Sequence, residues 1–270
     1  MNATDLFPKD LFAGKTVFVT GGGSGINLGI AKNFAALGAK LGICGRSQER
    51  LDGAAVELRA LGATVFTASL DVRDYPALEA ALSRCKAELG TLDVLVCGAA
   101  GNFPAAAEKM SANAFKAVVD IDLLGSYNAS RAAFPHLREQ GGCIIFISAG
   151  QAFTPYANQA HVGAAKAGID MLMKDLAVEW GKHGIRCNSI VPGPIENTEG
   201  FRRLGRGALG DKLTETIPLR RFGNVDDIGG CAVFLASPLA SYVTGTVLVA
   251  DGGQNLLGSG VWASIAAQTT

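Results

Sequence analysis

The sequence KTVFVTGGGSGINLG, residues 15–29, decides the fold of this 270-residue chain. Its apolar half, which ends at Thr20, has the length and composition of a buried strand, and a helical period follows. The glycines between them let the backbone approach a pyrophosphate closely, while the helix N-terminus offers free N–H groups and its positive dipole end. We predict a phosphate-binding turn here, with a merely tight turn as the alternative. The predicted contacts are Gly21, Gly23, Ser24, Gly25 and Ile26.

The same alternation of strand and helix continues along most of the chain. Further apolar runs of strand length lie at residues 40–45, 64–70, 92–98, 142–148, 185–191 and 245–251. Helical periods lie at residues 25–37, 48–61, 75–89, 111–140, 158–182 and 224–235. The strands are almost continuously hydrophobic, as in parallel strands covered on both faces. We predict one α/β domain over residues 1–270, a doubly wound sheet of seven mostly parallel strands with helices on both faces.

Residues 194–219 interrupt this alternation. They are charged and rich in glycine where a simple crossover needs few residues. Insertions between a strand and a helix commonly form substrate loops. We predict such a loop here, with a solvated surface loop as the alternative.

Composition argues against several classes of function. Lys plus Arg and Asp plus Glu both number 24, so no positive surplus exists to bind a nucleic acid. The uncharged stretch from Ile228 to Ala250 is broken by Pro238 and Gly245, which argues against a membrane span, and the first residues do not resemble a signal peptide. The six cysteines and three histidines show no metal-ligand spacing. We expect a cytoplasmic protein with reduced thiols, no metal, and no nucleic-acid or membrane partner.

The end of the second strand predicts which dinucleotide the turn binds. An acidic side chain at this place accepts a hydrogen bond from the 2′-hydroxyl of NAD, but this chain has Arg46 and Ser47. A guanidinium makes forked, charge-assisted contacts with phosphate oxygens, which suits a 2′-phosphate. NADP(H) is therefore the predicted cofactor, and a surface arginine in an ordinary loop is the alternative.

From about Lys15 to Leu256 the chain resembles the short-chain dehydrogenase/reductase family, which has a Rossmann-type fold. The resemblance rests on TGGGSGI at 20–26, LDV at 70–72, Lys166 in a helix, IRCNSIVPGPI at 185–195 and LASPLASYVTGTVLVADGG at 235–253. It implies a homotetramer. It also implies cofactor contacts at the adenine (Asp71, Val72), under the nicotinamide ribose (Ala99, Lys166) and around the nicotinamide (Pro192, Gly193, Ile195).

Most catalytic positions of that family are changed in this chain. Its catalytic tyrosine is replaced by Val162, the serine thirteen residues before that tyrosine by Ala149, and a supporting asparagine by Asp122, so that Lys166 alone is kept. Valine cannot exchange a proton, which excludes ordinary carbonyl reduction by that tyrosine. The usual Asn-Asn-Ala-Gly after the fourth strand reads Cys-Gly-Ala-Ala at 97–100. The third glycine of the turn is Asn27, which either crowds the cofactor or adds a contact.

Several segments resemble one branch of the family, the 2,4-dienoyl-CoA reductases of the peroxisomal type. These are AAGNF at 99–103, HVGAAKAGID at 161–170 and PGPIENTEGFRRLG at 192–205. That branch shares the loss of the tyrosine and has an aspartate at the position of Asp122. The resemblance implies NADPH-dependent reduction of a 2,4-dienoyl-CoA thioester. The final Gln-Thr-Thr is not a peroxisomal address, so we expect a bacterial, cytoplasmic version.

Reduction of a dienoyl thioester does not require the lost tyrosine. Hydride adds to the distal carbon, negative charge spreads to the thioester oxygen, and protonation follows at carbon. Lys166 is predicted to bind the nicotinamide ribose and to hold positive charge near the enolate. Asp122 is predicted to pair with Lys166 and to pass a proton through a bound water. A helix cap or a simple ion pair is the alternative for Asp122.

The acyl-CoA substrate has its own predicted contacts. Arginines in the 194–219 segment suit the phosphates of CoA, and aromatic side chains could line an acyl channel, although aromatic residues more often belong to the core. Tyr156 and His161 precede the Lys166 helix closely enough to act as proton donors, with loop packing and a helix-start role as alternatives. The predicted substrate set is Asn102, Phe103, Tyr156, His161, Phe201, Arg202 and Arg203.

Three functions remain open at this level. The first is an NADPH-dependent 2,4-dienoyl-CoA reductase. The second is a reductase of another carbonyl or enoyl substrate that uses Asp122 or Tyr156 as its acid. The third is an NADPH-binding pseudoenzyme that acts as a sensor or scaffold.

Overall fold

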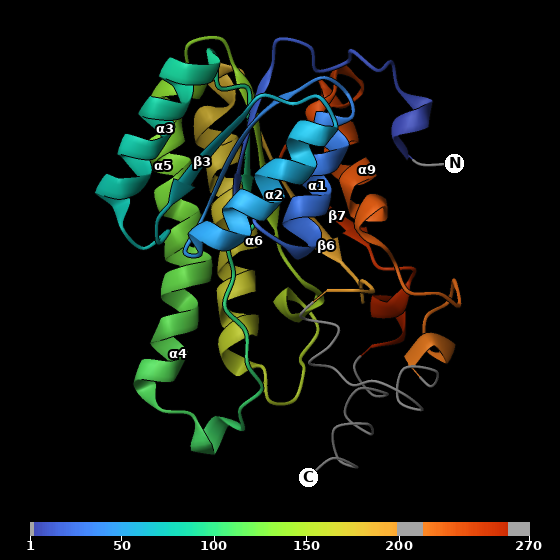
Figure 1. The fold of residues 1–270 in the computed structure, drawn as a ribbon. Helices are drawn as coiled ribbons and strands as arrows, with labels where there is room; N and C mark the ends of the chain where they lie inside the picture. The colour runs from blue at the N-terminus through green and yellow to red at the C-terminus, as the bar shows by residue number, and fades with distance from the viewer. Residues whose placement is uncertain (1–2, 199–212, 259–270) are drawn as a thin grey trace.

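A seven-stranded, fully parallel sheet forms the centre of the computed structural model, which describes residues 3–198 and 213–258. The strand order is β3-β2-β1-β4-β5-β6-β7 (Figure 1). This confirms the predicted doubly wound α/β architecture. The strands are β1 Thr16–Thr20, β2 Lys40–Gly45, β3 Val65–Ser69, β4 Val94–Cys97, β5 Gly142–Ile147, β6 Ile185–Pro192 and β7 Val247–Ala250.

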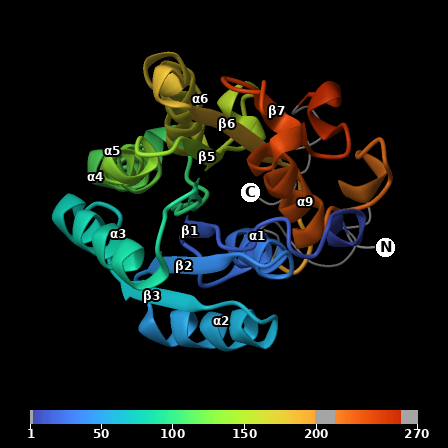
Figure 2. The same cartoon turned by 90° about the horizontal axis from the view of Figure 1, so that it is seen from above.

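Helices cover both faces of this sheet, as Figure 2 shows from above. On one face, α1 and α9 pack against each other and α2 lies beside α1, with Ile30, Phe34 and Ile228 in a shared core. On the other face, α3, α5 and α6 enclose a second core that includes Leu78 and Met173. The helices are α1 Gly25–Ala35, α2 Gln48–Ala60, α3 Tyr75–Leu89, α4 Ala112–Val119, α5 Gly125–Leu137, α6 Ala160–Trp180 and α9 Val225–Ala236.

The predicted helix over residues 111–140 is observed from Ala112 to Leu137, but it is not α-helical throughout. A π-helical turn, η3 at Asp120–Leu124, separates α4 from α5. Such turns are rare and occur often at functional sites, because the extra residue rotates the side chains that follow it. Apolar periodicity does not reveal this interruption. The remaining predicted elements match observed ones with small shifts at their ends.

Short 3-10 helices occupy several connections: η1 Ala3–Leu6, η2 Ala107–Lys109, η4 Gly150–Ala152, η5 Gly181–His183, η6 Pro238–Ala240 and η7 Gln254–Leu257. None of the helices in the described ranges is long and apolar enough to cross a membrane.

The strand order places the candidate site. β1 lies between β2 and β4. The chain therefore builds the sheet in one direction from β1 to β3 and in the opposite direction from β4 to β7. Thr20, the last residue of β1, is in register with Cys44 of β2 and Cys97 of β4. In sheets of this type, ligands bind in the crevice at the carboxyl ends of the strands where the order reverses. The loops after β1, β2, β4, β5 and β6 therefore surround one region.

Candidate functional site

The β1–α1 turn has the backbone that a phosphate site requires. Gly21 and Gly25 have φ values of 69° and 59°, a conformation that glycine adopts without steric strain. A Cβ atom on Gly21 would lie 3.0 Å from the Cα of Ala99, so a larger residue would force the two loops apart. Ser24 caps α1 without a side-chain hydrogen bond to the described helix. The side chain of Ser24 therefore does not occupy the first N–H groups of α1, which leaves them available to a ligand.

Asn27 connects this turn to the loop after β4. Its Nδ2 donates to the carbonyl of Gly98 over 2.8 Å and to that of Gly21 over 3.3 Å. A Cβ atom on Gly98 would lie 2.1 Å from Asn27 Oδ1. The side chain at position 27 therefore occupies the space that a side chain at position 98 would need. The two departures from the family pattern compensate each other, and Asn27 adds a contact between two loops of the site.

The carboxyl end of β2 presents Arg46 and Ser47 to solvent. Arg46 is exposed, as a contact with a charged ligand requires. The Oγ of Ser47 accepts a hydrogen bond from Arg50 N–H over 3.4 Å and so caps α2. A helix cap is thus a sufficient structural role for Ser47, while a phosphate contact stays a prediction for both residues.

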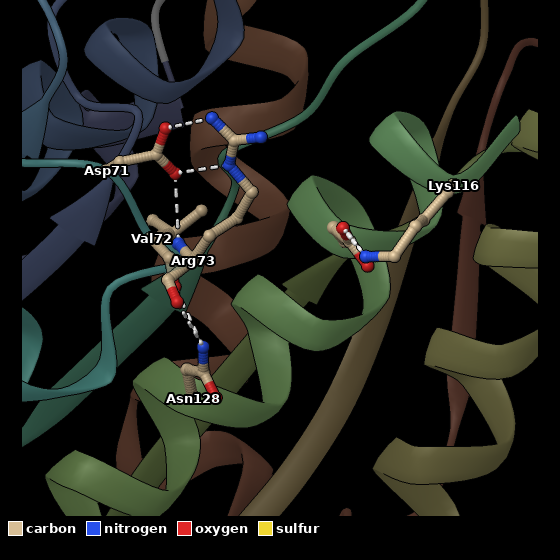
Figure 3. A network of polar contacts seen from close by, with 6 residues as sticks. Asp71, Val72, Arg73, Lys116 and Asn128 are labelled. Carbon is tan, nitrogen blue, oxygen red and sulfur yellow. Dashed lines mark hydrogen bonds and ion pairs between the residues drawn. The ribbon is translucent and has the colours of Figure 1, made fainter. Parts of the chain in front are cut away.

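Asp71 lies at the end of a polar network that includes Arg73 and Asn128 (Figure 3). Its carboxylate accepts two side-chain hydrogen bonds from Arg73, at 3.0 and 2.7 Å. Hydrogen bonding from Arg73 lowers the pKa of Asp71 despite opposing burial, and the charge of Arg46 adds to the effect. Val72 is buried, and its carbonyl accepts from Asn128 Nδ2 over 3.0 Å. Asn128 of α5 therefore holds Val72 in place, and Arg73 holds the carboxylate of Asp71.

The interaction between Asn128 and this loop was not predicted from the sequence. A polar residue on the inner face of a helix is the available signal, but it does not identify the partner. Figure 3 also shows the ion pair between Lys116 and Asp120 at the end of α4. The Asp120 charge also reaches Arg73 and contributes to raising the pKa of that guanidinium.

The predicted catalytic pair is formed and buried. Lys166 Nζ lies 3.1 Å from Asp122 Oδ2, and the two residues are 6% and 0% exposed. Asp122 belongs to the π-helical turn η3, and its Oδ1 accepts from the N–H of Gly101 over 2.7 Å. Lys166 also donates to the carbonyl of Ile147 over 3.0 Å. The ends of β4 and β5 thus hold both charges in fixed positions, and Asp122 is not a helix cap.

No proton-exchanging side chain replaces the lost tyrosine at its own position. Val162 is 3% exposed and packs in a small apolar cluster with Val118 and Ala165. Ala149 lies between β5 and η4. Acid–base chemistry at this site therefore depends on other residues.

His161 and Phe103 lie together next to the catalytic pair. His161 is fully buried, with its ring centroid 4.5 Å from that of Phe103. Burial lowers the pKa of His161, against smaller opposing effects from the Phe103 backbone and the Asp122 charge. Neither ring nitrogen makes a hydrogen bond of normal geometry with the described part of the chain. A buried neutral imidazole without such a partner is the kind of group that a substrate oxygen can satisfy.

Tyr156 lies in the loop between η4 and α6, near Asp251. Burial raises the pKa of Tyr156, and the charge of Asp251 adds to this shift. Asp251 is itself buried and accepts from Gly253 N–H and Asn255 N–H, both at 2.8 Å. Nothing in the local sequence around Asp251 indicated that its charge would act on Tyr156.

The loop after β6 completes the predicted nicotinamide region. The N–H of Gly193 donates to the carbonyl of Ala250 over 3.1 Å. A Cβ atom on Gly193 would lie 2.7 Å from the Cα of Asp251. Pro192 ends β6, and Ile195 is buried and bridges to Gly223.

The remaining substrate residues are distributed differently. Asn102 is exposed in the loop after β4. Phe201, Arg202 and Arg203 lie outside the described residues, as does most of the predicted substrate loop. Within the described ranges, no group of three or more His, Cys, Asp or Glu side chains could hold a metal ion.

Sequence comparison connects this site to reductases. The family model described as enoyl-(acyl carrier protein) reductase matches residues 21–255. A peroxisomal 2,4-dienoyl-CoA reductase of Saccharomyces cerevisiae, named as producing (3E)-enoyl-CoA, is 46% identical over 93% of this chain and 87% of the relative. A probable 2,4-dienoyl-CoA reductase of Bacillus subtilis, named as producing (2E)-enoyl-CoA, is 39% identical over 89% of this chain and 96% of the relative.

Solved structures of dehydrogenases share the fold of this chain. A gluconate 5-dehydrogenase of Burkholderia cenocepacia, solved with NADP and tartrate, has a TM-score of 0.86 and 31% identity over 92% of this chain and 98% of that protein. A protein described as a putative short-chain alcohol dehydrogenase from Sinorhizobium meliloti has a TM-score of 0.86 and 30% identity over 93% of this chain and 100% of that protein.

Proposed function

Because the chain belongs to the short-chain dehydrogenase/reductase family, a family of oxidoreductases, we propose that it reduces 2,4-dienoyl-CoA thioesters with NADPH. The observation that carries the proposal is the buried Asp122–Lys166 pair beside Val162, which stands where the family has its catalytic tyrosine. A site of this composition suits a substrate whose negative charge is delocalised, because no proton need reach a carbonyl oxygen as hydride arrives.

The nucleotide region fits NADP(H). A Cβ atom on Gly25, the first residue of α1, would have no neighbour within 4 Å, so the N-terminus of this helix borders open space. Arg46 and Ser47 would bind the 2′-phosphate, and Gly23 and Ile26 would line the pyrophosphate. When bound, NADPH supplies the hydride.

The residues of the pair then have separate tasks. Lys166 binds the nicotinamide ribose, and its positive charge stabilises the developing dienolate, for which one positioned donor contributes about 3 kcal/mol. Asp122 keeps Lys166 charged and oriented, and it passes a proton toward the substrate carbon. His161 faces the thioester end as a hydrogen-bond donor, and Tyr156 closes the opposite side.

The other predicted contacts belong to the thioester and CoA portions. Asn102 and Phe103 follow the acyl chain on the β4 side. Phe201, Arg202 and Arg203 bind the CoA portion, with the arginines on its phosphates.

We also propose a homotetramer of single-domain subunits that acts in the cytoplasm. Exposed apolar side chains on the α4–α6 surface, among them Tyr127, Met171 and Val178, support association, and the free cysteines of the described chain suit a reducing compartment. Analytical ultracentrifugation tests the assembly.

The first experiment follows NADPH absorbance with 2,4-hexadienoyl-CoA, a 2-enoyl-CoA and a 3-ketoacyl-CoA in parallel. We expect rapid oxidation with the dienoyl substrate alone. Oxidation with one of the other thioesters instead would assign a different substrate class. NADPH binding without turnover on any of the three would identify a nucleotide-binding sensor.

A further inference from the structure

The hydroxyl of Ser126 is bound to the main chain of Asp122. Ser126 lies in the first turn of α5, and its Oγ donates to the carbonyl of Asp122 over 2.6 Å. Ser126 is only 5% exposed, so bulk water competes little for this hydrogen bond. The catalytic scheme above assigns no task to Ser126.

The carboxylate of Asp122 has few direct constraints of its own. Its Oδ1 accepts from the N–H of Gly101 over 2.7 Å. Its Oδ2 lies 3.1 Å from Lys166 Nζ but has no hydrogen-bond partner of normal geometry in the described part of the chain. The direction of this side chain therefore depends on the main chain at position 122, which Ser126 holds at the carbonyl.

The main chain at position 122 departs from a regular α-helix. It belongs to the π-helical turn η3, where the N–H of Gly125 donates both to the carbonyl of Asp120, five residues earlier, and to that of Asp122. A serine hydroxyl that bonds to the carbonyl four residues before it favours a bent helix. The Ser126 hydrogen bond therefore favours this turn over a straight helix, which would direct Asp122 differently.

Ser126 is itself connected to the sheet. Its carbonyl accepts from the Sγ of Cys97, the last residue of β4, over 3.8 Å, and from Ser130 Oγ over 2.8 Å. Burial raises the pKa of Cys97 to about 12, so its thiol keeps the proton that it donates. Cys97 replaces the first asparagine of the usual Asn-Asn-Ala-Gly. One departure from the family pattern thus supports the turn that carries another, Asp122.

Packing encloses the π turn on two sides. A Cβ atom on Gly125 would lie 2.5 Å from Cγ2 of Val72, and one on Gly168 would lie 2.8 Å from Cδ2 of Leu123. The turn therefore lies between the loop after β3 and helix α6. Because this packing does not involve the Ser126 hydroxyl, its removal should reorient the turn locally and leave the fold intact.

We propose that Ser126 is a positioning residue, whose hydroxyl holds the π turn in the conformation that directs the Asp122 carboxylate toward Lys166. The inference rests on the proposed function, because it concerns the proton transfer that Asp122 performs there. Ser126 acts through Asp122 and does not touch the substrate or the cofactor.

The test compares Ser126→Ala with Ser130→Ala. Each variant removes one buried hydroxyl of α5 that donates to the carbonyl four residues before it. With 2,4-hexadienoyl-CoA, we expect Ser126→Ala to lower kcat about tenfold while KM and the Kd of NADPH change by less than about twofold, because a catalytic group is displaced. Ser130→Ala should keep kcat near the wild-type value, because the carbonyl of Ser126 retains Cys97 as a donor.

Two further variants separate positioning from a general structural role. Ser126→Thr keeps the hydroxyl and should retain most of the wild-type kcat. In the Asp122→Asn background, Ser126→Ala should have almost no further effect on kcat, because residues that act as one unit are not additive. Steady-state kinetics of the single and double variants measure this coupling, and the Kd of NADPH reports that each variant is folded.

Wild-type kcat in Ser126→Ala would overturn the positioning role and leave the reductase intact. Equal losses in Ser126→Ala and Ser130→Ala, or in Ser126→Ala and Ser126→Thr, would show that packing of α5 is responsible and would also overturn it. So would a loss that multiplies with that of Asp122→Asn. A wild-type enzyme that is silent with the dienoyl substrate would overturn the proposed function, and the positioning role with it.

Discussion

The β1–α1 turn and the Asp122–Lys166 pair lie at the same edge of the sheet but are built by different means. The turn consists of consecutive residues whose backbone does the work, through left-handed glycines and a helix N-terminus. The pair consists of side chains distant in sequence that the β4 loop, a π-helical turn and α6 bring together. The turn can bind its ligand through backbone groups, which do not depend on particular side chains. The pair depends on its side chains, so substitutions there can change the chemistry of the site without changing the fold.

The largest effect expected from this comparison is on the side-chain site. Asp122→Asn keeps the volume but leaves the buried Lys166 without its counter-charge. We expect kcat with the dienoyl substrate to fall about 100-fold or more, while the Kd of NADPH changes by less than about threefold. Steady-state kinetics and fluorescence titration measure the two quantities. Asp120→Asn in the same π turn is the matched control and should keep wild-type kcat.

If Asp122→Asn instead weakened NADPH binding as much as turnover, the two regions would not be separable. The pair would then belong to the cofactor site, and the contrast between backbone-built and side-chain-built regions would fail.

The backbone-built region should respond to packing rather than charge. Gly98→Ala introduces a Cβ atom against Asn27, and we expect the free energy of unfolding to fall by about 1–3 kcal/mol. Asn27→Ala removes the opposing side-chain atoms, so Gly98→Ala should have almost no effect in that background. Denaturant unfolding of the two single variants and the double variant measures the coupling. Additive effects would mean that Asn27 and Gly98 do not compensate each other.

Arg46, which follows β2 at the edge of the backbone-built nucleotide region, should determine the preference for NADPH over NADH. Arg46→Ala removes a charged contact to the 2′-phosphate, so we expect the Kd of NADPH to rise about tenfold while that of NADH changes little. Isothermal titration with both cofactors measures this. Arg59→Ala, at the far end of α2, is the control. An equal loss for both cofactors would place Arg46 at the pyrophosphate instead.

The same contrast explains how much the sequence reveals. The seven strands and the β1–α1 turn follow from contiguous apolar runs and glycines, which are local signals. The pair of Asp122 with Lys166 was expected through the family resemblance, and its geometry depends on a π-helical turn that hydrophobic periodicity does not encode. Asn128 under Val72 and Ser126 beside Cys97 were not predicted, because a polar residue on a helix face does not name its partner on another element.

His161 provides the smallest and most local test of the side-chain-built region. Burial lowers its pKa in the folded state, so below the unfolded value of about 6.5 the folded protein binds fewer protons than the unfolded chain. Stability should therefore decrease as the pH falls from about 6.5 toward the lower folded pKa. His161→Phe removes this titration, so the free energy of unfolding of the variant should depend less on pH over that range. His136, whose pKa is also lowered by burial, is present in both proteins and cancels in the comparison. Asp71 and Asp227 have lowered pKa values and titrate at lower pH, outside this range.

Equal pH dependence in the two proteins would show that His161 is not held neutral. A variant with the expected flatter profile but unchanged turnover would assign His161 to packing against Phe103, and would limit the chemistry of this region to the Asp122–Lys166 pair.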